Sequence, residues 1–529
     1  MHSFMIRKLF KTFISSEVET KMFKFFKKRC NNTKIKKNCK INTILVQTVE
    51  DYFYYGLFGK IISDIKDTRN INVEQIVIRN LSVGASKSFT GFLKSIFIYN
   101  RYKDKKWINL YSSFCDSVAI QYENSVNINT DIKLLVQSYQ IFKMIKCKSD
   151  ILNISYKGIE LGELIYDSYL RYKPAPTINC NDYYLIVIIW QGLRNVTLTK
   201  MYFFDYNIKI LLSSYSSYIQ HGIATQVALK NNIKVFTFGN EQSLEKELSI
   251  NDMYHTSAFL QYRQEFNKKK NTTLLLKEAQ ILLNSRLNGK IDIATSYMKE
   301  SAYKIKINNI PNVAGSIVIF LHDFYDSIYN YGKLVFLDFI DWIEFTIKTL
   351  DEYNIDYYLK PHPNQIEDSA KVLDNLIIKY PHIKVLSSKI TNRQLVDRNI
   401  STGISMYGTV AHELVYMGVP VILSAQNPHS SYSFCFESTT KNEYKNYIKN
   451  YKKLTLPIDY KEQVESFYYM HNLNNTKEEL ALLDIISQFR KINKLNSNDQ
   501  ITKFEEYIDS LSNNKAYNIF VKKLVKIVL

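Results

Sequence analysis

The chain has 529 residues, 46% of them hydrophobic, and a formal net charge of +19 at pH 7. This length favours two large domains over one, and the hydrophobic fraction excludes a wholly disordered chain. The six cysteines form no C-x-x-C pair and follow no metal-ligand spacing, which indicates a reducing compartment and no structural zinc site. The uninterrupted apolar runs are too short to span a bilayer, and the first residues contain no apolar region of the signal-peptide kind. We therefore expect a cytoplasmic protein.

Residues 1–40 form a basic arm. They contain twelve Lys or Arg and two Glu, a net charge of +10, in stretches such as "IRKLFKTFI" and "MFKFFKKR". The last segment, 491–529, is predicted to be a helical tail and ends in "IFVKKLVKIVL". Both segments mix cations with bulky apolar residues, as amphipathic helices on an anionic membrane leaflet do. The alternatives are a disordered arm and an ordinary terminal core helix. No nucleic-acid motif accompanies the charge, so we expect a membrane surface and not a nucleic acid as partner.

Residues 41–312 are predicted to form the first α/β domain. Continuous apolar runs predict buried parallel strands at 41–49, 73–81, 183–190, 208–215 and 233–239. A helix is predicted over 50–65, and the stretch 90–180 is predicted to be mostly helical. The segment "IQHGIATQVALKNN" at 219–232 predicts a loop that opens a helix.

Residues 313–490 show a clearer alternation of strands and helices. Strands are predicted at 316–323, 356–363, 383–388, 400–406 and 419–425, and helices at 334–354, 367–380 and 409–418. Such alternation predicts a parallel sheet with both faces covered. The expected fold class is α/β, with two Rossmann-like domains that face a cleft between their strand ends.

The stretch "LKPHPNQ" at 359–365 follows a predicted strand and contains two of the nine prolines. Pro361 and Pro363 keep Lys360 and His362 out of the helical region, so both side chains are presented at the carboxyl edge of the sheet with little freedom. Lys supplies charge and His a directional N–H donor, a combination suited to an anion. The alternative is a histidine at a strand end that only caps a loop.

A second motif, "GISMYGTVAHELVYMGVPVI" at 403–422, reads as a strand, a turn and a helix. Ser405, Gly408 and Thr409 gather at the predicted helix start, where backbone N–H groups and the helix dipole attract phosphate. Glu413 lies one turn later on the same helix face, where a carboxylate could accept hydrogen bonds from ribose hydroxyls. The alternative is a helix cap at Thr409 and a surface residue at Glu413.

"KPHP", "ISMYGT" and "AHELVYMGVPVI" together resemble the carboxy-terminal half of bacterial surface-polysaccharide transferases of the two-Rossmann (GT-B) type, among them the capsule-synthesis, sialyl- and Kdo-transferase groups. "IFLHDFYDSIYNYG" and "DWIEFTIKTL" also look like capsule-synthesis proteins. The resemblance covers roughly 315–450 and implies a nucleotide-linked donor. It implies that His362, Ser405 and Thr409 bind the phosphates of the nucleotide and that Glu413 binds the ribose.

A transferase also needs a general base, which in two-domain enzymes of this type usually comes from the first domain. His221, in "QHG", resembles the His-Gly element of glycerophosphotransferase relatives and has an ordinary pKa suited to proton abstraction. The competing carboxylates follow the first strand of each predicted domain: Glu50, Asp51, Asp323 and Asp326. No apolar-flanked D-x-D motif is present, so we expect a reaction without a metal or other cofactor.

These observations predict an inverting glycosyltransferase of capsule or lipo-oligosaccharide synthesis, peripheral on the inner face of the cell membrane. It would move a sugar from a nucleotide-activated donor to a glycan or lipid-linked glycan. The alternatives are a CDP-polyol phosphotransferase of the teichoic-acid type, a nucleotide-sugar epimerase, and a non-catalytic membrane-associated subunit of polysaccharide assembly.

Overall fold

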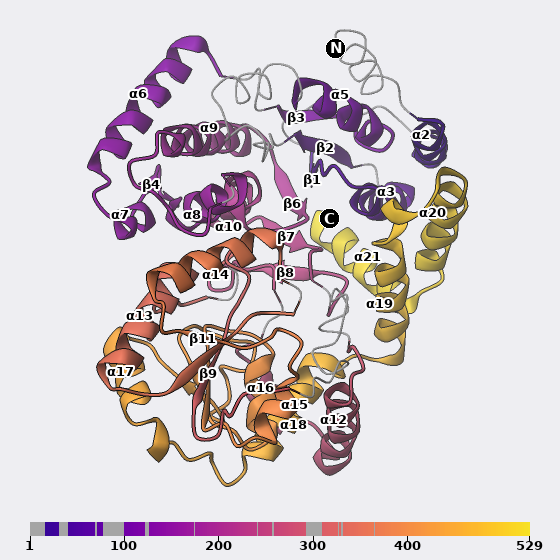
Figure 1. The fold of residues 1–529 in the computed structure, drawn as a ribbon. Helices are drawn as coiled ribbons and strands as arrows, with labels where there is room; N and C mark the ends of the chain where they lie inside the picture. Colours follow the sequence, from indigo (N-terminus) through magenta and orange to yellow (C-terminus); the bar gives the residue numbers. More distant parts are fainter. Residues whose placement is uncertain are drawn as a thin grey trace. The chain divides into compact units, whose positions relative to one another are not determined.

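The computed structural model describes residues 16–30, 41–68, 71–77, 100–121, 126–173, 175–240, 242–256, 259–292, 309–325, 327–329, 332–363 and 365–529. They form two compact units (Figure 1). Unit 1 comprises Met1–Pro174, Asn179–His255 and Thr476–Leu529, and unit 2 comprises Ala175–Ile178 and Thr256–Asn475. The units divide the chain differently from the expected boundaries at 312 and 490, because the helices after residue 256 pack with the second sheet and those after 476 return to the first.

The sheet of unit 1 has six strands in the order β3-β2-β1-β6-β7-β8. All neighbours are parallel except β7 and β8, which are antiparallel. In chain order the strands are β1 Thr43–Gln47, β2 Asn72–Val77, β3 Ser117–Gln121, β6 Ile208–Ser213, β7 Lys234–Thr237 and β8 Lys246–Leu248. The first three strands run outward from β1 on one side and the last three on the other, which is the Rossmann order.

Both faces of this sheet are buried, which explains the continuous apolar runs of its strands. Ile44, Val46 and Leu212 belong to the large core on one face, whereas Leu45 and Leu211, which point to the other face, are also buried. The helices of unit 1 are α2 Glu17–Arg29, α3 Tyr52–Thr68, α5 Asn100–Tyr111, α6 Ile128–Met144, α7 Lys148–Leu152, α8 Gly162–Tyr172, α9 Tyr184–Asp205, α10 Ile223–Lys230, α19 Lys477–Phe489, α20 Ser497–Ser512 and α21 Lys515–Val528, with a small hairpin of β4 Ser155–Tyr156 and β5 Ile159–Glu160.

The prediction of a strand at 183–190 was wrong, because this run begins the long helix α9. Leu185, Ile188 and Ile189 are completely buried, and the same spacing continues beyond the run at Leu193 and Val196. Residues at these intervals share one face of a helix. The isoleucines and valine of the run favour a strand locally, but the helical face extends over 22 residues. The other predicted strands of this unit and the helices at 50–65 and 90–180 are confirmed in outline.

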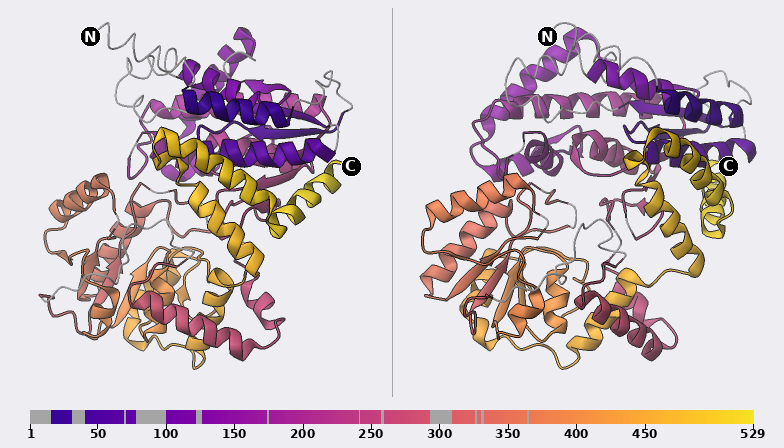
Figure 2. Two further views of the ribbon diagram at one scale, coloured as in Figure 1. Left: turned by 90° about the vertical axis from the view of Figure 1, so that its right-hand side faces the viewer. Right: turned by 45° about the vertical axis from the view of Figure 1, so that its right-hand side comes forward.

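Both terminal segments contribute apolar faces to the core of unit 1. In α2 these residues are Val18, Met22 and Phe26, and in α21 they are Tyr517, Phe520, Val521, Leu524 and Val528. Figure 2 shows α19 to α21, in yellow, beside the indigo helices of the unit. The apolar residues expected to enter a membrane are thus occupied in the core here, and residues 1–15 and 31–40 of the arm lie outside the described residues. In the described part of the chain, every helix is too short or too polar to cross a bilayer.

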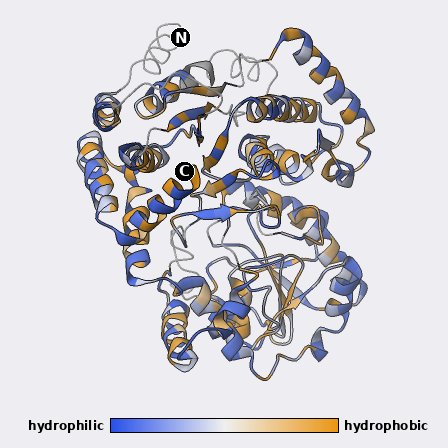
Figure 3. Cartoon of the chain, turned by 180° about the vertical axis from the view of Figure 1, so that it is seen from behind, coloured by the Kyte–Doolittle hydropathy of each residue, from blue (hydrophilic) through white to orange (hydrophobic). Residues whose placement is uncertain are grey.

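The sheet of unit 2 repeats the same order, β11-β10-β9-β12-β13-β14, with all neighbours parallel. In chain order the strands are β9 Ile317–Phe320, β10 Tyr357–Lys360, β11 Lys384–Val385, β12 Thr402–Ser405, β13 Val421–Leu423 and β14 Phe436–Glu437. The helices are α11 Tyr262–Asn267, α12 Thr272–Leu287, α13 Phe339–Glu352, α14 Glu367–Lys379, α15 Asn392–Val396, α16 Val410–Tyr416, α17 Lys441–Lys449 and α18 Tyr460–Asn472. In Figure 3 the helices of both units carry hydrophilic and hydrophobic stretches, as expected when one face packs on a sheet. The predicted fold class, two Rossmann-like α/β domains, is confirmed.

Candidate functional site

The carboxyl edge of the second sheet has a switch point beside β9. The chain runs from β9 outward through β10 to β11 and then returns to the other side of β9 at β12. Ligands of open α/β sheets bind outside the carboxyl ends of the strands at such a point. The residues that directly follow β9, β10 and β12 are therefore the candidates for a binding site.

Two histidines follow neighbouring strands at this edge. Phe320 of β9 pairs with Lys360 of β10, so His322 and His362 each lie two residues beyond the same pair. Their ring centroids are 6.4 Å apart, and the rings are tilted by 31°. The sequence singled out His362 only. The sign that could have indicated His322 is its place directly after the apolar run IVIFL, at the end of a predicted strand.

Aromatic contacts hold His322 in position. Its ring stacks on Phe339, the first residue of α13, with centroids 4.8 Å apart and planes 4° apart. Tyr407, two residues beyond β12, lies 4.8 Å from the same ring and donates from its hydroxyl to the Ser327 carbonyl at 3.2 Å. His322 is thus oriented by elements from both sides of the switch point.

Burial controls the charge of the two predicted ligands in "KPHP". It lowers the pKa of Lys360 to about 8, and the Glu413 carboxylate opposes this shift. Burial also lowers the pKa of His362 to about 4, and the neighbouring His322 and Lys360 add to the shift. At neutral pH, Lys360 is therefore mostly a cation and His362 a neutral imidazole. The strand ends at Lys360, slightly earlier than predicted.

The hydroxyl of Ser405 is directed at the backbone. It is buried and donates to the carbonyls of Phe320, at 3.3 Å, and Tyr407, at 3.1 Å. One hydroxyl proton serves both acceptors, so Ser405 ties the end of β12 to the end of β9 in this arrangement. Its predicted contact with a phosphate stays a prediction.

Gly408 and Thr409 form the turn into α16. Gly408 has φ +133°, a conformation that favours glycine, and apart from its two chain neighbours no described residue has an atom within 4 Å of the position a Cβ would occupy. Its N–H donates to the Asn427 side chain at 2.9 Å. Thr409 occupies the N-cap position without a capping hydrogen bond, and its hydroxyl accepts from Arg286 at 3.4 Å. The turn leaves room above Gly408, while the N–H predicted for phosphate is bonded to Asn427.

Glu413 is a buried partner of Arg286 and not a surface residue. Arg286, near the end of α12, donates to Oε1 of Glu413 from Nε at 2.8 Å and from Nη2 at 2.6 Å. Asn392 donates to Oε2 at 3.2 Å, and Asp292 pairs with the other arm of Arg286 at 3.0 Å. The sequence contained no sign of Arg286, which lies in an interval without a recognisable motif. A contact between Glu413 and a ribose stays a prediction.

Two of the carboxylates predicted as general bases accept hydrogen bonds at the beginning of a helix. Oδ1 of Asp323 accepts from the Ser369 hydroxyl at 2.7 Å, at the beginning of α14. Oδ1 of Asp51 accepts from the Phe53 N–H at 2.7 Å at the beginning of α3, and Oδ2 accepts from Asn493 at 2.7 Å. Glu50 is half-buried between β1 and α3, and Asp326 lies outside the described residues. These hydrogen bonds favour structural roles for Asp323 and Asp51.

His221 lies in a π-helical turn, Tyr218–Gly222, at the carboxyl edge of the first sheet. Oε1 of Gln47 accepts from the Ser214 backbone N–H at 3.0 Å, so the amide nitrogen of Gln47 faces Nδ1 of His221 and donates to it. The imidazole proton of His221 therefore resides on Nε2. Burial lowers the pKa of His221 to about 3. In this tautomer Nε2 carries the proton and can only donate a hydrogen bond. A general base must accept a proton, so this tautomer does not fit the predicted role.

A second histidine, His255, lies beside His221 and was missed. Its ring centroid is 5.0 Å from that of Tyr215, and its Nδ1 is 3.4 Å from the hydroxyls of Ser216 and Ser217. Burial lowers its pKa to about 4. Within the described residues, no three His, Cys, Asp or Glu side chains are placed to hold a metal ion together.

The chain matches no protein-family model and no curated protein. Among solved structures, it is similar to the UDP-GlcNAc 2-epimerase of Methanocaldococcus jannaschii in complex with UDP-GlcNAc and UDP, at 11% identity over 80% of this chain and 97% of that one, with a TM-score of 0.22. The UDP-GlcNAc 2-epimerase of Neisseria meningitidis bound to UDP-GlcNAc is 10% identical over 84% and 98%, with a TM-score of 0.20. A putative UDP-N-acetylglucosamine 2-epimerase of Listeria monocytogenes is 8% identical over 87% and 98%, with a TM-score of 0.21. At these values the fold assignment rests on the strand order of the two sheets.

Proposed function

We propose that the chain is a metal-independent glycosyltransferase that takes a sugar from a nucleotide-activated donor. The observation that carries the proposal is the pair of imidazoles, His322 and His362, at adjacent strand ends beside the switch point, with the buried amine of Lys360 two residues before His362. The imidazoles offer directed N–H donors, and the ammonium offers charge, at the place where such sheets bind nucleotides.

In the proposed reaction, an acceptor hydroxyl attacks the anomeric carbon of the donor sugar while the bond to the leaving phosphate oxygen breaks. The electron pair of that bond moves onto the phosphate, and the proton of the acceptor hydroxyl passes to a base. His322, His362 and Lys360 stabilise the charge that develops on the phosphate, and because they are already positioned, no reorganisation is needed as the bond breaks. Attack from the face opposite the leaving group inverts the configuration.

The resemblance of 315–450 to capsule-synthesis and sialyl- or Kdo-transferase proteins supports the finer part of the proposal. On that ground the acceptor is a growing surface glycan, of a capsule or a lipo-oligosaccharide, and the enzyme works at the inner face of the cell membrane. The basic character of both terminal segments supports the same location.

Thermal-shift measurements with CMP, CDP, UDP and GDP test the donor site. A nucleotide present at 100 times its dissociation constant stabilises the protein by about 2.7 kcal/mol, and His362→Ala should abolish this shift. The matched control is His382→Ala, which removes an exposed histidine of the same unit, paired with Asp351. If none of the nucleotides stabilises the wild type, the proposal fails. Binding without transfer or hydrolysis would favour a non-catalytic subunit, and selective binding of CDP with polyol-phosphate transfer would favour the phosphotransferase.

A further inference from the structure

Helix α21 packs with one face only, and its other face is cationic. Tyr517, Phe520 and Leu524 are buried in the core of unit 1, whereas Lys522, Lys523 and Lys526 are exposed on the opposite side. Ile519 lies on this outer side and is 60% exposed. Because the apolar face is fixed in the core, the cations are presented by a rigid helix and not by a flexible tail.

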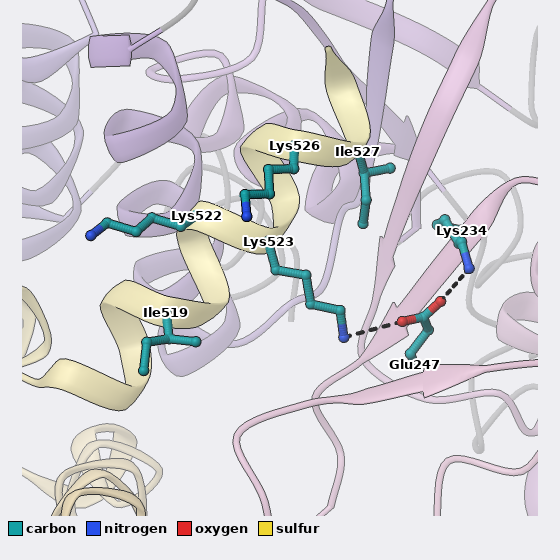
Figure 4. Close-up of a pocket in the computed structure, with 7 residues that line it drawn as sticks. All are labelled: Lys234, Glu247, Ile519, Lys522, Lys523, Lys526 and Ile527. Atoms are coloured by element: carbon teal, nitrogen blue, oxygen red, sulfur yellow. Dashed lines mark hydrogen bonds and ion pairs between the residues drawn. The ribbon is translucent and has the colours of Figure 1, made fainter.

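The outer side of α21 and the strands β7 and β8 border a shallow groove of about 530 Å³. Figure 4 shows the residues that line it: Lys234, Glu247, Ile519, Lys522, Lys523, Lys526 and Ile527. Four of these seven residues are lysines and one is an acid. The groove lies within unit 1, so its shape is given by that unit alone.

The single acid of the groove is already paired. Glu247 accepts from Lys234 at 2.6 Å and from Lys523 at 3.1 Å. In Figure 4 the side chain of Lys523 reaches toward Glu247, whereas Lys522 extends in the other direction. Glu247 therefore compensates the cations on the strand side of the groove and not those of the outer helix face.

Lys522 and Lys526 lie one helical turn apart on the outer face of α21. In the part of the chain that the structure describes, no carboxylate forms an ion pair with either of them, and the α21 sequence KAYNIFVKKLVKIV contains no Asp or Glu. Like charges four residues apart on a helix repel each other. An anion that contacts both ammonium groups would relieve this repulsion.

We propose that this outer face of α21, with Lys522 and Lys526 as its cations and Ile519 as its apolar contact, docks the protein on the phosphate headgroups of an anionic membrane. The exposed isoleucine beside the lysines favours a lipid surface over a soluble acidic glycan, because an apolar side chain gains from the headgroup boundary. The inference deepens the proposed function, since it names the surface that brings the enzyme to a membrane-linked acceptor, and vesicle binding itself requires no transfer.

Co-sedimentation with vesicles tests the proposal in the full chain, with phosphatidylglycerol mixed into phosphatidylcholine as probe and phosphatidylcholine alone as reference. The variant Lys522→Gln/Lys526→Gln should bind the anionic vesicles about thirtyfold more weakly than the wild type. Ile519→Ser should leave the binding at low salt nearly intact and remove the part that survives high salt. The matched control, Lys452→Gln/Lys453→Gln, makes the same change of charge on unit 2 and should bind as the wild type does.

Substitutions are preferable to deletion of 515–529, because deletion would remove part of the core of unit 1. If the Lys522/Lys526 variant binds anionic vesicles as tightly as the wild type, or if the wild type binds neither kind of vesicle, the proposal is overturned. Equal loss in the Lys452/Lys453 control would also overturn it, since the contact would then depend on net charge alone. Transfer to a soluble acceptor should persist in all these variants, so its absence from the wild type would count against the proposed function and not against the docking surface.

Discussion

Arg286 and Glu413 form a buried ion pair between α12 and α16, in which Nε and Nη2 of the arginine lie 2.8 and 2.6 Å from one carboxylate oxygen. The residues are 127 positions apart in the chain, and each is at most 6% exposed. The pair joins α12 to α16, the helix that begins beside the candidate site. Removal of one partner would leave a charge buried without compensation.

We predict that Arg286→Met destabilises unit 2 by about 3–5 kcal/mol, the usual effect of breaking a buried ion pair from one side. Urea unfolding, monitored by a signal that comes from unit 2, measures the loss of stability. Arg263→Met, at an exposed position of α11, is the matched control and should change stability by less than about 0.5 kcal/mol. A loss below ~1 kcal/mol for Arg286→Met would contradict a structural role for the pair. Loss of nucleotide affinity in a folded Glu413→Gln variant would instead support the predicted ribose contact.

The two histidines of the candidate site should act together. His362→Ala and His322→Ala are each expected to lower kcat/KM by roughly a hundredfold, from the loss of about 3 kcal/mol of transition-state stabilisation, while the fold survives. The double variant should lose less than the product of the two effects if both imidazoles contact one phosphate. Steady-state transfer kinetics, with His382→Ala as control, measure this. Near wild-type turnover in a folded His362→Ala protein would make that histidine structural.

Transfer should continue in excess EDTA. The reason is that no apolar-flanked D-x-D motif is present in the sequence, and that His322, His362 and Lys360 gather where the leaving phosphate is proposed to bind. Initial rates with and without the chelator measure the effect, after dialysis to remove loosely held ions. Complete loss of activity that Mg²⁺ or Mn²⁺ restores would rule out the metal-independent mechanism.

The protein should lose stability as the pH falls below about 6.5, the ordinary pKa of histidine. Burial, the first cause in each case, lowers the pKa of His412 to about 3 and that of His471 to about 4, and it lowers the pKa of His429 as well. Because the unfolded chain binds these protons more readily, the stabilisation is complete above pH 6.5 and declines as the pH falls toward 4. Each histidine contributes a slope of up to ~1.4 kcal/mol per pH unit.

Urea unfolding midpoints measured from pH 7 down to pH 5 give this slope. His412→Phe should make it shallower, because the ring lies against Phe467 in an apolar setting, 5.2 Å between centroids, and phenylalanine cannot take up a proton. His382→Gln, at an exposed position, should leave it unchanged. A midpoint that does not depend on pH in this range would show that the three histidines are hydrated in solution.

Local patterns in the sequence were sufficient for most of the strands and for the place of the candidate site. The run "IVIF" is apolar throughout because both faces of β9 are covered, and the prolines around His362 mark the end of β10. Both signals involve residues within a few positions of each other. They predict which segments are strands, where those strands end and hence which edge of the sheet carries the polar side chains.

The tertiary structure decided everything that depends on residues far apart in the chain. The helix Tyr184–Asp205 was missed for a local reason, because the apolar run 183–190 taken alone fits a strand until its spacing is followed to Val196. Three features of the two sites depend on a residue from another element. Arg286 pairs with Glu413, His322 lies beside His362, and Gln47 determines the tautomer of His221. The apolar faces of the terminal helices, with Phe26 and Phe520, were expected in a membrane and instead pack in the core of unit 1, whereas the cationic outer face of α21 stays exposed. A sequence pattern records that a helix has an apolar face; only the folded chain determines which surface that face covers.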